Sequence, residues 1–262
     1  MTPKVLVLTG YGINCDMETQ HAFKLAGADA ERVHLTDLLN GTKKLGDFQI
    51  LALPGGFSFG DDIASGKVLA NMIRYNLGKE MREFIDAGKL IIGICNGFQA
   101  MVKMGLLPGF NGDYNTQEVT LTFNDSGKFE DRWVYLKTNP ESKCVFTKGI
   151  DRIYLPVRHG EGKFVARNQQ VLAGLKKGNH IVFRYVDREG KPAGYPYNPN
   201  GSVDDIAGIC DETGRIFGMM PHPEAFQHRT NHPRWTREEL PEEGAGITIF
   251  RNAVEYAREK LY

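Results

Sequence analysis

A cysteine between two glycines is the strongest candidate for a reactive side chain in this sequence. Residues 90–94 (LIIGI) predict a buried strand and a helical pattern follows at once, so Cys95 lies at a strand-to-helix turn. Gly93 and Gly97 allow that turn to be tight, as in a G-x-C-x-G nucleophile elbow. A helix N-terminus favours the thiolate of a group whose usual pKa is about 8.5. Cys95 is therefore a candidate nucleophile with the N–H of Asn96 as an oxyanion donor, and a buried strand-end cysteine is the alternative.

Two further segments contain the groups that such a nucleophile requires. Residues 53–57 (LPGGF) follow an apolar run, and Gly56 has no side chain to block a ligand, so its N–H can serve as a second oxyanion donor. A nucleophilic cysteine also needs a base, and the base needs an acceptor that orients it. His222 and Glu224 lie two residues apart in a loop stiffened by prolines, and they can supply both. Each segment on its own is equally explained by an ordinary turn or surface loop.

The elements that position these residues alternate between strand and helix in the first hundred residues. Strands are predicted at 4–9, 30–35, 48–53 and 90–94, and helices at 16–26, 68–87 and 96–104, with a break at Gly78. Continuous apolar strands that are each followed by a helix are typical of a parallel sheet covered on both faces. The predicted fold is therefore α/β, an open, mostly parallel sheet with helices on both faces.

The second half of the chain is richer in turn residues. Short strands are predicted at 118–123, 133–137, 152–156 and 181–185, a hairpin at 206–210 and 216–219, and a C-terminal helix at 247–261. Residues 225–246 are polar and predict a long surface segment. Because no linker precedes the strands, we expect β-rich insertions in a single domain over 1–262 with an extended C-terminal tail, 225–262.

Composition excludes several classes of protein. The chain has 262 residues, with 32 Lys+Arg against 32 Asp+Glu, so its net charge does not suit a general nucleic-acid binder. No apolar run reaches the roughly 18 residues of a membrane helix. The four cysteines are far apart and include no CxxC pair, which favours a reducing cytoplasm over a disulfide framework. We expect Cys15, Cys144 and Cys210 to be ordinary buried residues.

Three other patterns do not match the nucleotide-binding or metal-binding motifs that they resemble. Residues 10–15 begin like a dinucleotide fingerprint but have Cys15 in place of the third glycine, and residues 60–67 depart from a phosphate loop in spacing. His222, His228 and His232 lack the helical spacing of a zinc protease, so no metal is expected and a solvated loop explains the last two. His159 and Glu161 remain an alternative base pair near the site or at a partner interface.

Three motifs together resemble the pattern of the class I (triad) glutamine amidotransferase family. In chain order they are PGG at 54–56, GxCxGxQ at 93–99 and HPE at 222–224. The resemblance implies that Cys95 attacks the side-chain amide of L-glutamine, that His222 relays protons and that Glu224 orients the histidine. It also implies a γ-glutamyl thioester, release of ammonia, and an oxyanion hole formed by the N–H groups of Gly56 and Asn96. By the same resemblance, the substrate is bound by Gly55, Phe57 and Gln99.

Longer motifs narrow the resemblance to the glutaminase subunits or domains of phosphoribosylformylglycinamidine synthase, a purine-pathway enzyme. These motifs are GINCD at 12–16, PGGFSFGD at 54–61, GICNGFQ at 93–99, RHGEG at 158–162, NPNGS at 198–202 and GICDETGR at 208–215. The resemblance implies no cofactor in this chain. It implies a separate synthetase subunit as partner, with ATP and Mg on that subunit, and leaves open a small third subunit.

The sequence departs from that family at its C-terminal end. Ala225 follows HPE where arginine is common, and residues 225–246 are longer than in short bacterial subunits. We expect these departures to affect docking to the partner rather than the chemistry of the active site. The alternatives are the glutaminase subunit of another amidotransferase, a cysteine hydrolase of similar architecture, and a catalytically silent scaffold subunit.

Overall fold

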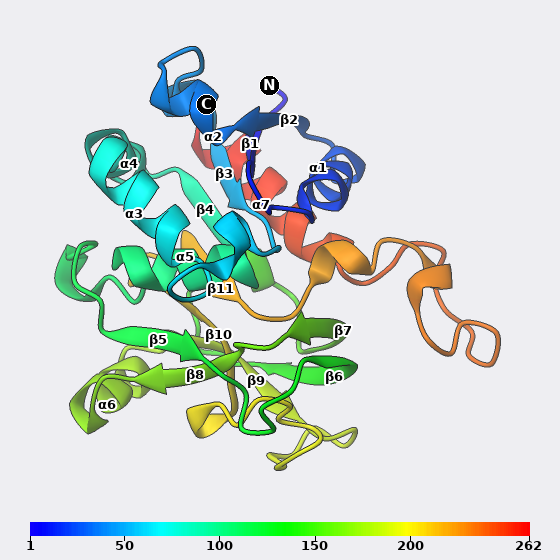
Figure 1. The fold of residues 1–262 in the computed structure, drawn as a ribbon. Coiled ribbons are helices and arrows are strands. Elements are labelled where there is room, and N and C mark those ends of the chain that lie inside the picture. The colour runs from blue at the N-terminus through cyan, green and yellow to red at the C-terminus, as the bar shows by residue number, and fades with distance from the viewer.

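The computed structural model describes residues 1–262 and contains one nine-stranded sheet (Figure 1). Its strands, in sheet order, are β2 (Asp29–His34), β1 (Lys4–Thr9), β3 (Ile50–Leu53), β4 (Leu90–Ile94), β11 (Ile216–Met219), β10 (Ile206–Cys210), β9 (Ile181–Val186), β6 (Glu130–Thr138) and β7 (Arg152–His159). Strands β2, β1, β3, β4 and β11 are parallel to one another. The other four strands extend the sheet by antiparallel pairing.

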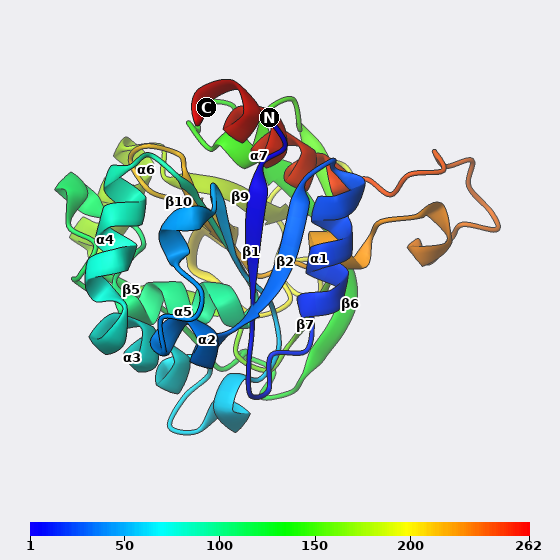
Figure 2. The ribbon, with the colours of Figure 1, turned by 90° about the horizontal axis from the view of Figure 1, so that it is seen from above.

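Helices cover both faces of this sheet. They are α1 (Asp16–Leu25), α2 (Leu35–Leu39), α3 (Lys67–Asn76), α4 (Gly78–Asp86), α5 (Asn96–Met104), α6 (Gln169–Lys177) and α7 (Ile247–Lys260). Helices α1 and α7 pack together on one face, and α3 and α5 on the other (Figure 2). Strands β3 and β4 consist entirely of buried residues, as expected for strands covered on both sides.

A second, two-stranded sheet lies against α5. It pairs β5 (Val119–Thr122) with β8 (Lys163–Ala166) in antiparallel register and contacts α5 through β5. Every residue of α5 is buried, because α3 and this small sheet cover the sides of the helix that the main sheet leaves free. The helix that follows Cys95 is therefore enclosed by the fold.

The open α/β fold and most of its elements agree with the sequence-based predictions. The hairpin of β10 and β11 is confirmed, and the predicted helix at 68–87 breaks at Leu77 into α3 and α4. Leu35 was expected to end a strand but begins α2, because the His34 imidazole accepts a hydrogen bond from the Thr36 N–H and caps that helix. Strands β6 and β7 are longer than predicted, and β8 and α6 were not predicted.

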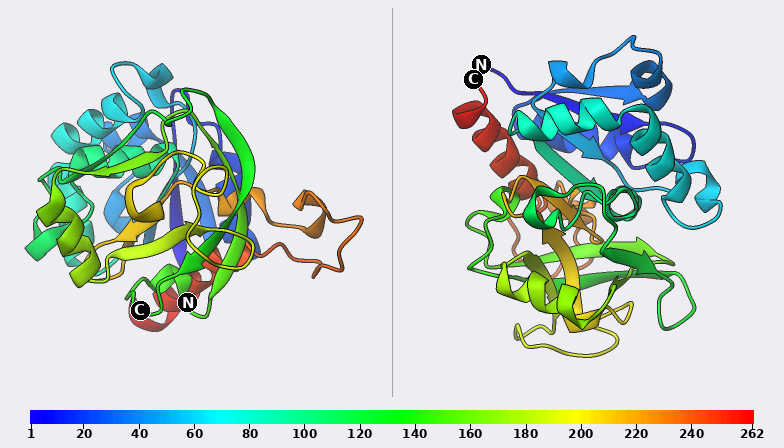
Figure 3. Two further views of the ribbon diagram at one scale, coloured as in Figure 1. Left: turned by 90° about the horizontal axis from the view of Figure 1, so that it is seen from below. Right: turned by 90° about the vertical axis from the view of Figure 1, so that its left-hand side faces the viewer.

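Residues 228–243, called the arm here, project from the body of the molecule between β11 and α7 (Figure 3). An isolated bridge between His228 and Glu243 closes the base of the arm. His232 was expected in a solvated loop, but it is only 5% exposed because it packs against the Trp133, Tyr154 and Phe226 rings. None of the helices combines the length and apolar character that a membrane crossing requires.

Candidate active site

Three neighbouring parallel strands bring the predicted segments to one edge of the sheet. Leu53 of β3 is in register with Gly93 of β4, and Ile94 of β4 with Met219 of β11. The Cys95 N–H donates to the carbonyl oxygen of Met219 over 2.8 Å, which continues that register by one residue. The loops that follow the three strands therefore begin side by side at the carboxyl edge, where open α/β sheets bind their ligands.

The turn at Cys95 has the backbone of a nucleophile elbow. Cys95 adopts φ 51° and ψ −107°, a conformation that costs a non-glycine residue about 1–3 kcal/mol. A β-carbon at Gly97 would lie 1.8 Å from the carbonyl oxygen of Leu53, and one at Gly93 would lie 2.3 Å from the Met101 sulfur. Both glycines are thus required by the close packing around the strained turn at Cys95.

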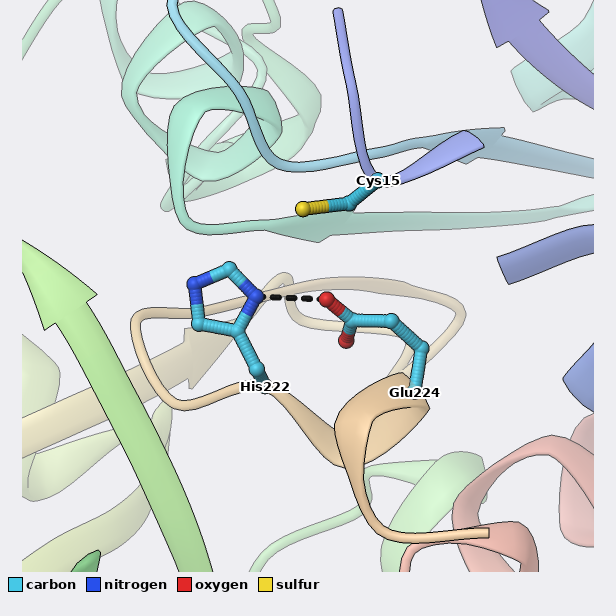
Figure 4. A group of neighbouring side chains, drawn as sticks. All are labelled: Cys15, His222 and Glu224. Carbon is cyan, nitrogen blue, oxygen red and sulfur yellow. Dashed lines mark hydrogen bonds and ion pairs between the residues drawn. The ribbon is translucent and has the colours of Figure 1, made fainter. Parts of the chain in front are cut away.

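His222 and Glu224 form a buried pair after β11. Nδ1 of His222 lies 2.5 Å from Oε1 of Glu224, and both side chains are almost fully buried (Figure 4). The second ring nitrogen of His222, Nε2, is buried and has no hydrogen-bond partner. The carboxylate thus fixes one face of the imidazole, and the other nitrogen remains free to exchange protons with the site.

The charge on His222 is set by its two acidic neighbours. Burial lowers the pKa of His222, but the Glu224 carboxylate and the Cys95 thiol both raise it, and its pKa lies well above the ordinary value. The coupling places Cys95 and His222 within electrostatic reach of each other. The raised pKa favours the protonated form of His222 beside the Cys95 sulfur, and this form can donate a proton to a leaving group.

Two backbone N–H groups near Cys95 have no backbone acceptor. They belong to Gly56, in the loop after β3, and to Asn96, the first residue of α5. The Gly56 N–H is held in place because Ile13 pairs with Gly56 in an antiparallel bridge. Gly55 makes room for the His222 ring, since a β-carbon there would lie 2.8 Å from it. The site thus combines a thiol, a paired histidine and two free donors.

Comparison with known proteins agrees with this geometry. Residues 2–257 match the family described as the CobB/CobQ-like glutamine amidotransferase domain. The chain belongs to this family. The amidotransferase is 54% identical to "Phosphoribosylformylglycinamidine synthase subunit PurQ" of Dehalococcoides mccartyi, over 98% of each chain. It resembles a chain in the "Structure of PurLQS from Thermotoga maritima", with a TM-score of 0.73, 32% identity and coverage of 98% and 99% of the two chains.

One longer relative matches this chain over only a small part of its own length. "Phosphoribosylformylglycinamidine synthase" of Dictyostelium discoideum is 38% identical over 85% of this chain, which corresponds to 17% of that protein. The amidotransferase is thus similar to a whole subunit in some organisms and to one part of a long polypeptide in another.

Phe57 and Gln99, which are also predicted to bind the substrate, differ in their exposure and in their contacts. Phe57 is 46% exposed, with its ring 6.3 Å from that of Phe129. The Gln99 amide is buried, accepts a hydrogen bond from Asn96 at 3.0 Å and donates to the backbone oxygen of Glu161 at 2.6 Å. Gln99 thus ties α5 of the amidotransferase to the 160–162 turn, and its contact with glutamine stays a prediction.

His159 and Glu161 do not act as a pair in this structure. Nδ1 of His159 lies 3.1 Å from Oδ1 of Asn124, while Glu161 uses its backbone oxygen to accept from Gln99. Burial and then the charge of His222 lower the pKa of His159 to about 3. His159 is therefore neutral, and the hydrogen bonds that it shares with Asn124 organise the turn beside the site.

Arg158 and Cys15 are the site residues of the amidotransferase to which the sequence assigned no role. Nη2 of Arg158 lies 3.5 Å from Nδ1 of His222, 3.8 Å from Oε1 of Glu224 and 4.0 Å from the Cys15 sulfur. Cys15 is placed there because its N–H donates to the Gly55 carbonyl oxygen. The signal was present, since both residues lie in motifs of the family resemblance, GINCD and RHGEG.

Proposed function

We propose that this chain is the glutaminase subunit of phosphoribosylformylglycinamidine synthase, and that Cys95, His222 and Glu224 are its catalytic residues. The observation that carries the proposal is the buried His222–Glu224 pair beside Cys95 at one sheet edge. It occurs in a chain related over nearly its whole length to subunits of that enzyme. The reaction is hydrolysis of L-glutamine to glutamate and ammonia.

The first half of the reaction forms a thioester. The Cys95 thiolate attacks the side-chain amide carbon of glutamine, and the N–H groups of Gly56 and Asn96 donate to the resulting oxyanion. His222, whose raised pKa favours the protonated form, gives a proton to the amide nitrogen. The carbon–nitrogen bond breaks, ammonia leaves, and a γ-glutamyl thioester remains on Cys95.

The second half of the reaction releases glutamate. His222, now neutral, takes a proton from water through Nε2, and the hydroxide attacks the thioester carbonyl. The oxyanion donors act again, and the carbon–sulfur bond breaks. The products are glutamate and the Cys95 thiolate beside a protonated His222, so the resting charges are restored. Throughout, Glu224 holds the imidazole through Nδ1.

The ammonia is used by a separate subunit. We propose that an ATP-dependent synthetase, with ATP and Mg on that partner, converts formylglycinamide ribonucleotide to formylglycinamidine ribonucleotide with this ammonia. The division is supported by the relative named "Phosphoribosylformylglycinamidine synthase subunit PurQ" and by the likeness to a chain in the "Structure of PurLQS from Thermotoga maritima". We further propose that the complex works in the cytoplasm.

The test is glutamine hydrolysis by the full chain with and without the purine-pathway synthetase, combined with labelling by a glutamine-mimicking electrophile. We expect slow hydrolysis alone, faster hydrolysis with the synthetase, and a single label on Cys95. Labelling without stimulation would indicate the glutaminase of another amidotransferase. Peptide hydrolysis would indicate a general cysteine hydrolase, and a folded chain that neither hydrolyses nor labels would indicate a silent subunit.

A further inference from the structure

We propose that Cys15, His222 and Glu224 form a binding site for Zn²⁺, and that a metal bound there inhibits the enzyme. The ligand atoms of these three residues all lie within 4.8 Å of one another, and all three residues are buried. Figure 4 shows the Cys15 sulfur directed at the imidazole, with Glu224 on the same side of the ring. The binding stands on this geometry alone, whereas the inhibition rests on the proposed glutaminase activity.

The donor set selects the type of metal. Sulfur, imidazole nitrogen and carboxylate oxygen together suit Zn²⁺ and not the oxygen-seeking Mg²⁺ or Ca²⁺. Oε2 of Glu224 is buried without a hydrogen-bond partner, so the carboxylate carries an unsatisfied oxygen beside the cluster. A cation would satisfy that oxygen.

Small movements convert the cluster to zinc geometry. With bonds of about 2.0–2.3 Å, the ligand atoms around tetrahedral zinc lie roughly 3.3–3.8 Å apart. Nδ1 of His222 and Oε1 of Glu224, now 2.5 Å apart, must therefore separate by about 1 Å. The metal takes the place of the proton on Nδ1, and that proton and the Cys15 thiol proton pass to solvent.

This exchange explains the inhibition. A metal on Nδ1 breaks the direct contact with Glu224 and withdraws electron density from the ring. Nε2 of His222 then becomes a poor base for water. The Cys95 nucleophile is not a ligand in this arrangement, so the metal disables proton transfer and leaves the nucleophile in place.

Arg158 already occupies the cation position of the cluster. Its Nη2 lies 3.5–4.0 Å from the Cys15 sulfur and from Nδ1 of His222. The guanidinium therefore repels an incoming metal and must swing toward solvent, which its partial exposure of 37% permits. The site thus carries its own competing cation, and loss of the Arg158 charge should tighten metal binding.

The test is a titration of the full chain with Co²⁺ followed by displacement with Zn²⁺, read by the thiolate-to-cobalt charge-transfer absorption. We expect this absorption in the unaltered chain, its loss in Cys15→Ala and its persistence in Cys95→Ala. Arg158→Gln should lower the Kd for Zn²⁺ by about tenfold or more, in parallel with stronger inhibition of glutamine hydrolysis.

Each outcome of this titration either supports or contradicts the proposed metal site. If the absorption persists in Cys15→Ala and disappears in Cys95→Ala, the nucleophile holds the metal and the proposal is wrong. Weaker binding in Arg158→Gln would also contradict it, and this variant retains every ligand if Cys15→Ala fails to fold. Binding with the expected variant pattern but without measurable glutaminase would overturn the proposed function and leave the metal site standing.

Discussion

The N–H of Cys95 donates to the carbonyl oxygen of Met219 over 2.8 Å, so the proposed nucleophile is joined by a backbone hydrogen bond to the strand that leads into His222. Because this bond continues the parallel register of β4 and β11, the separation of thiol and imidazole is fixed by the sheet. The site depends little on the conformation of surface loops. Conservative substitutions of the Cys95 and Glu224 side chains should therefore report on chemistry rather than on folding.

Replacement of the nucleophile should separate two activities. Cys95→Ser should lower glutamine-dependent synthesis by the complex at least about 10³-fold, because the catalytic residues act as a unit. Synthesis from added ammonium salts should remain, since only amide hydrolysis uses the thiol. Both rates can be measured as product formation by the reconstituted complex. Cys144→Ala, a buried cysteine outside the site, serves as the control, and equal loss of both activities in Cys95→Ser would contradict two separable sites.

Loss of the carboxylate charge should affect catalysis more than binding. Glu224→Gln keeps the size of the side chain but removes the charge that raises the pKa of His222. We expect kcat for glutamine hydrolysis to fall roughly 10²- to 10⁴-fold with little change in KM. The pH profile for alkylation of Cys95 should also shift in this variant. Glu83→Gln, an exposed residue of α4, is the matched control, and an unchanged pH profile in Glu224→Gln would refute this role.

A single methyl group at the elbow should destabilise the protein. Gly97→Ala places a β-carbon 1.8 Å from the Leu53 carbonyl oxygen, so β3 and α5 must move apart. We expect the free energy of unfolding, measured with urea, to fall by about 3 kcal/mol or more. Gly46→Ala meets nothing within 4 Å and should change stability only slightly. Similar values for the two variants would show that the packing at Gly97 is loose.

The buried His159 should make stability depend on pH. Its pKa is about 3 in the folded chain and returns to its ordinary value of 6.5 on unfolding. Between these values the unfolded chain binds a proton that the folded chain does not, so stability falls as the pH falls, by about 1.4 kcal/mol per unit. Urea unfolding between about pH 4.5 and 6.5 should show this slope reduced in His159→Gln. The slope should be unchanged in His21→Gln, which replaces an exposed histidine.

The parts of the fold that sequence predicts well are those where local signals agree with long-range packing. The apolar runs at β3 and β4 and the glycines at 93 and 97 gave the elbow, because burial and turn chemistry favour the same structure there. Helix α6 was missed, although Asn168 caps it through a hydrogen bond to the Val171 N–H. Its short apolar pattern lay among turn residues that favoured loops.

The contacts that sequence could not supply are those between distant segments. Cys15, Arg158 and His222 are more than sixty positions apart, and nothing local indicates that the guanidinium of Arg158 lies against the imidazole of His222. Similarly, His232 lies in a polar stretch, and its burial depends on aromatic residues of β6 and β7. Only the sheet order brings these groups together.

The closed base of the arm makes it a module whose length is free to vary. The Arg229 N–H donates to the carbonyl oxygen of Glu242, next to the His228–Glu243 bridge, so the chain leaves and re-enters the body at one place. The distance between β11 and α7 is therefore independent of how many residues lie at the tip. A peptide tag or a fluorescent protein inserted at 236–241 would leave the triad undisturbed and report directly on what the arm meets in the complex.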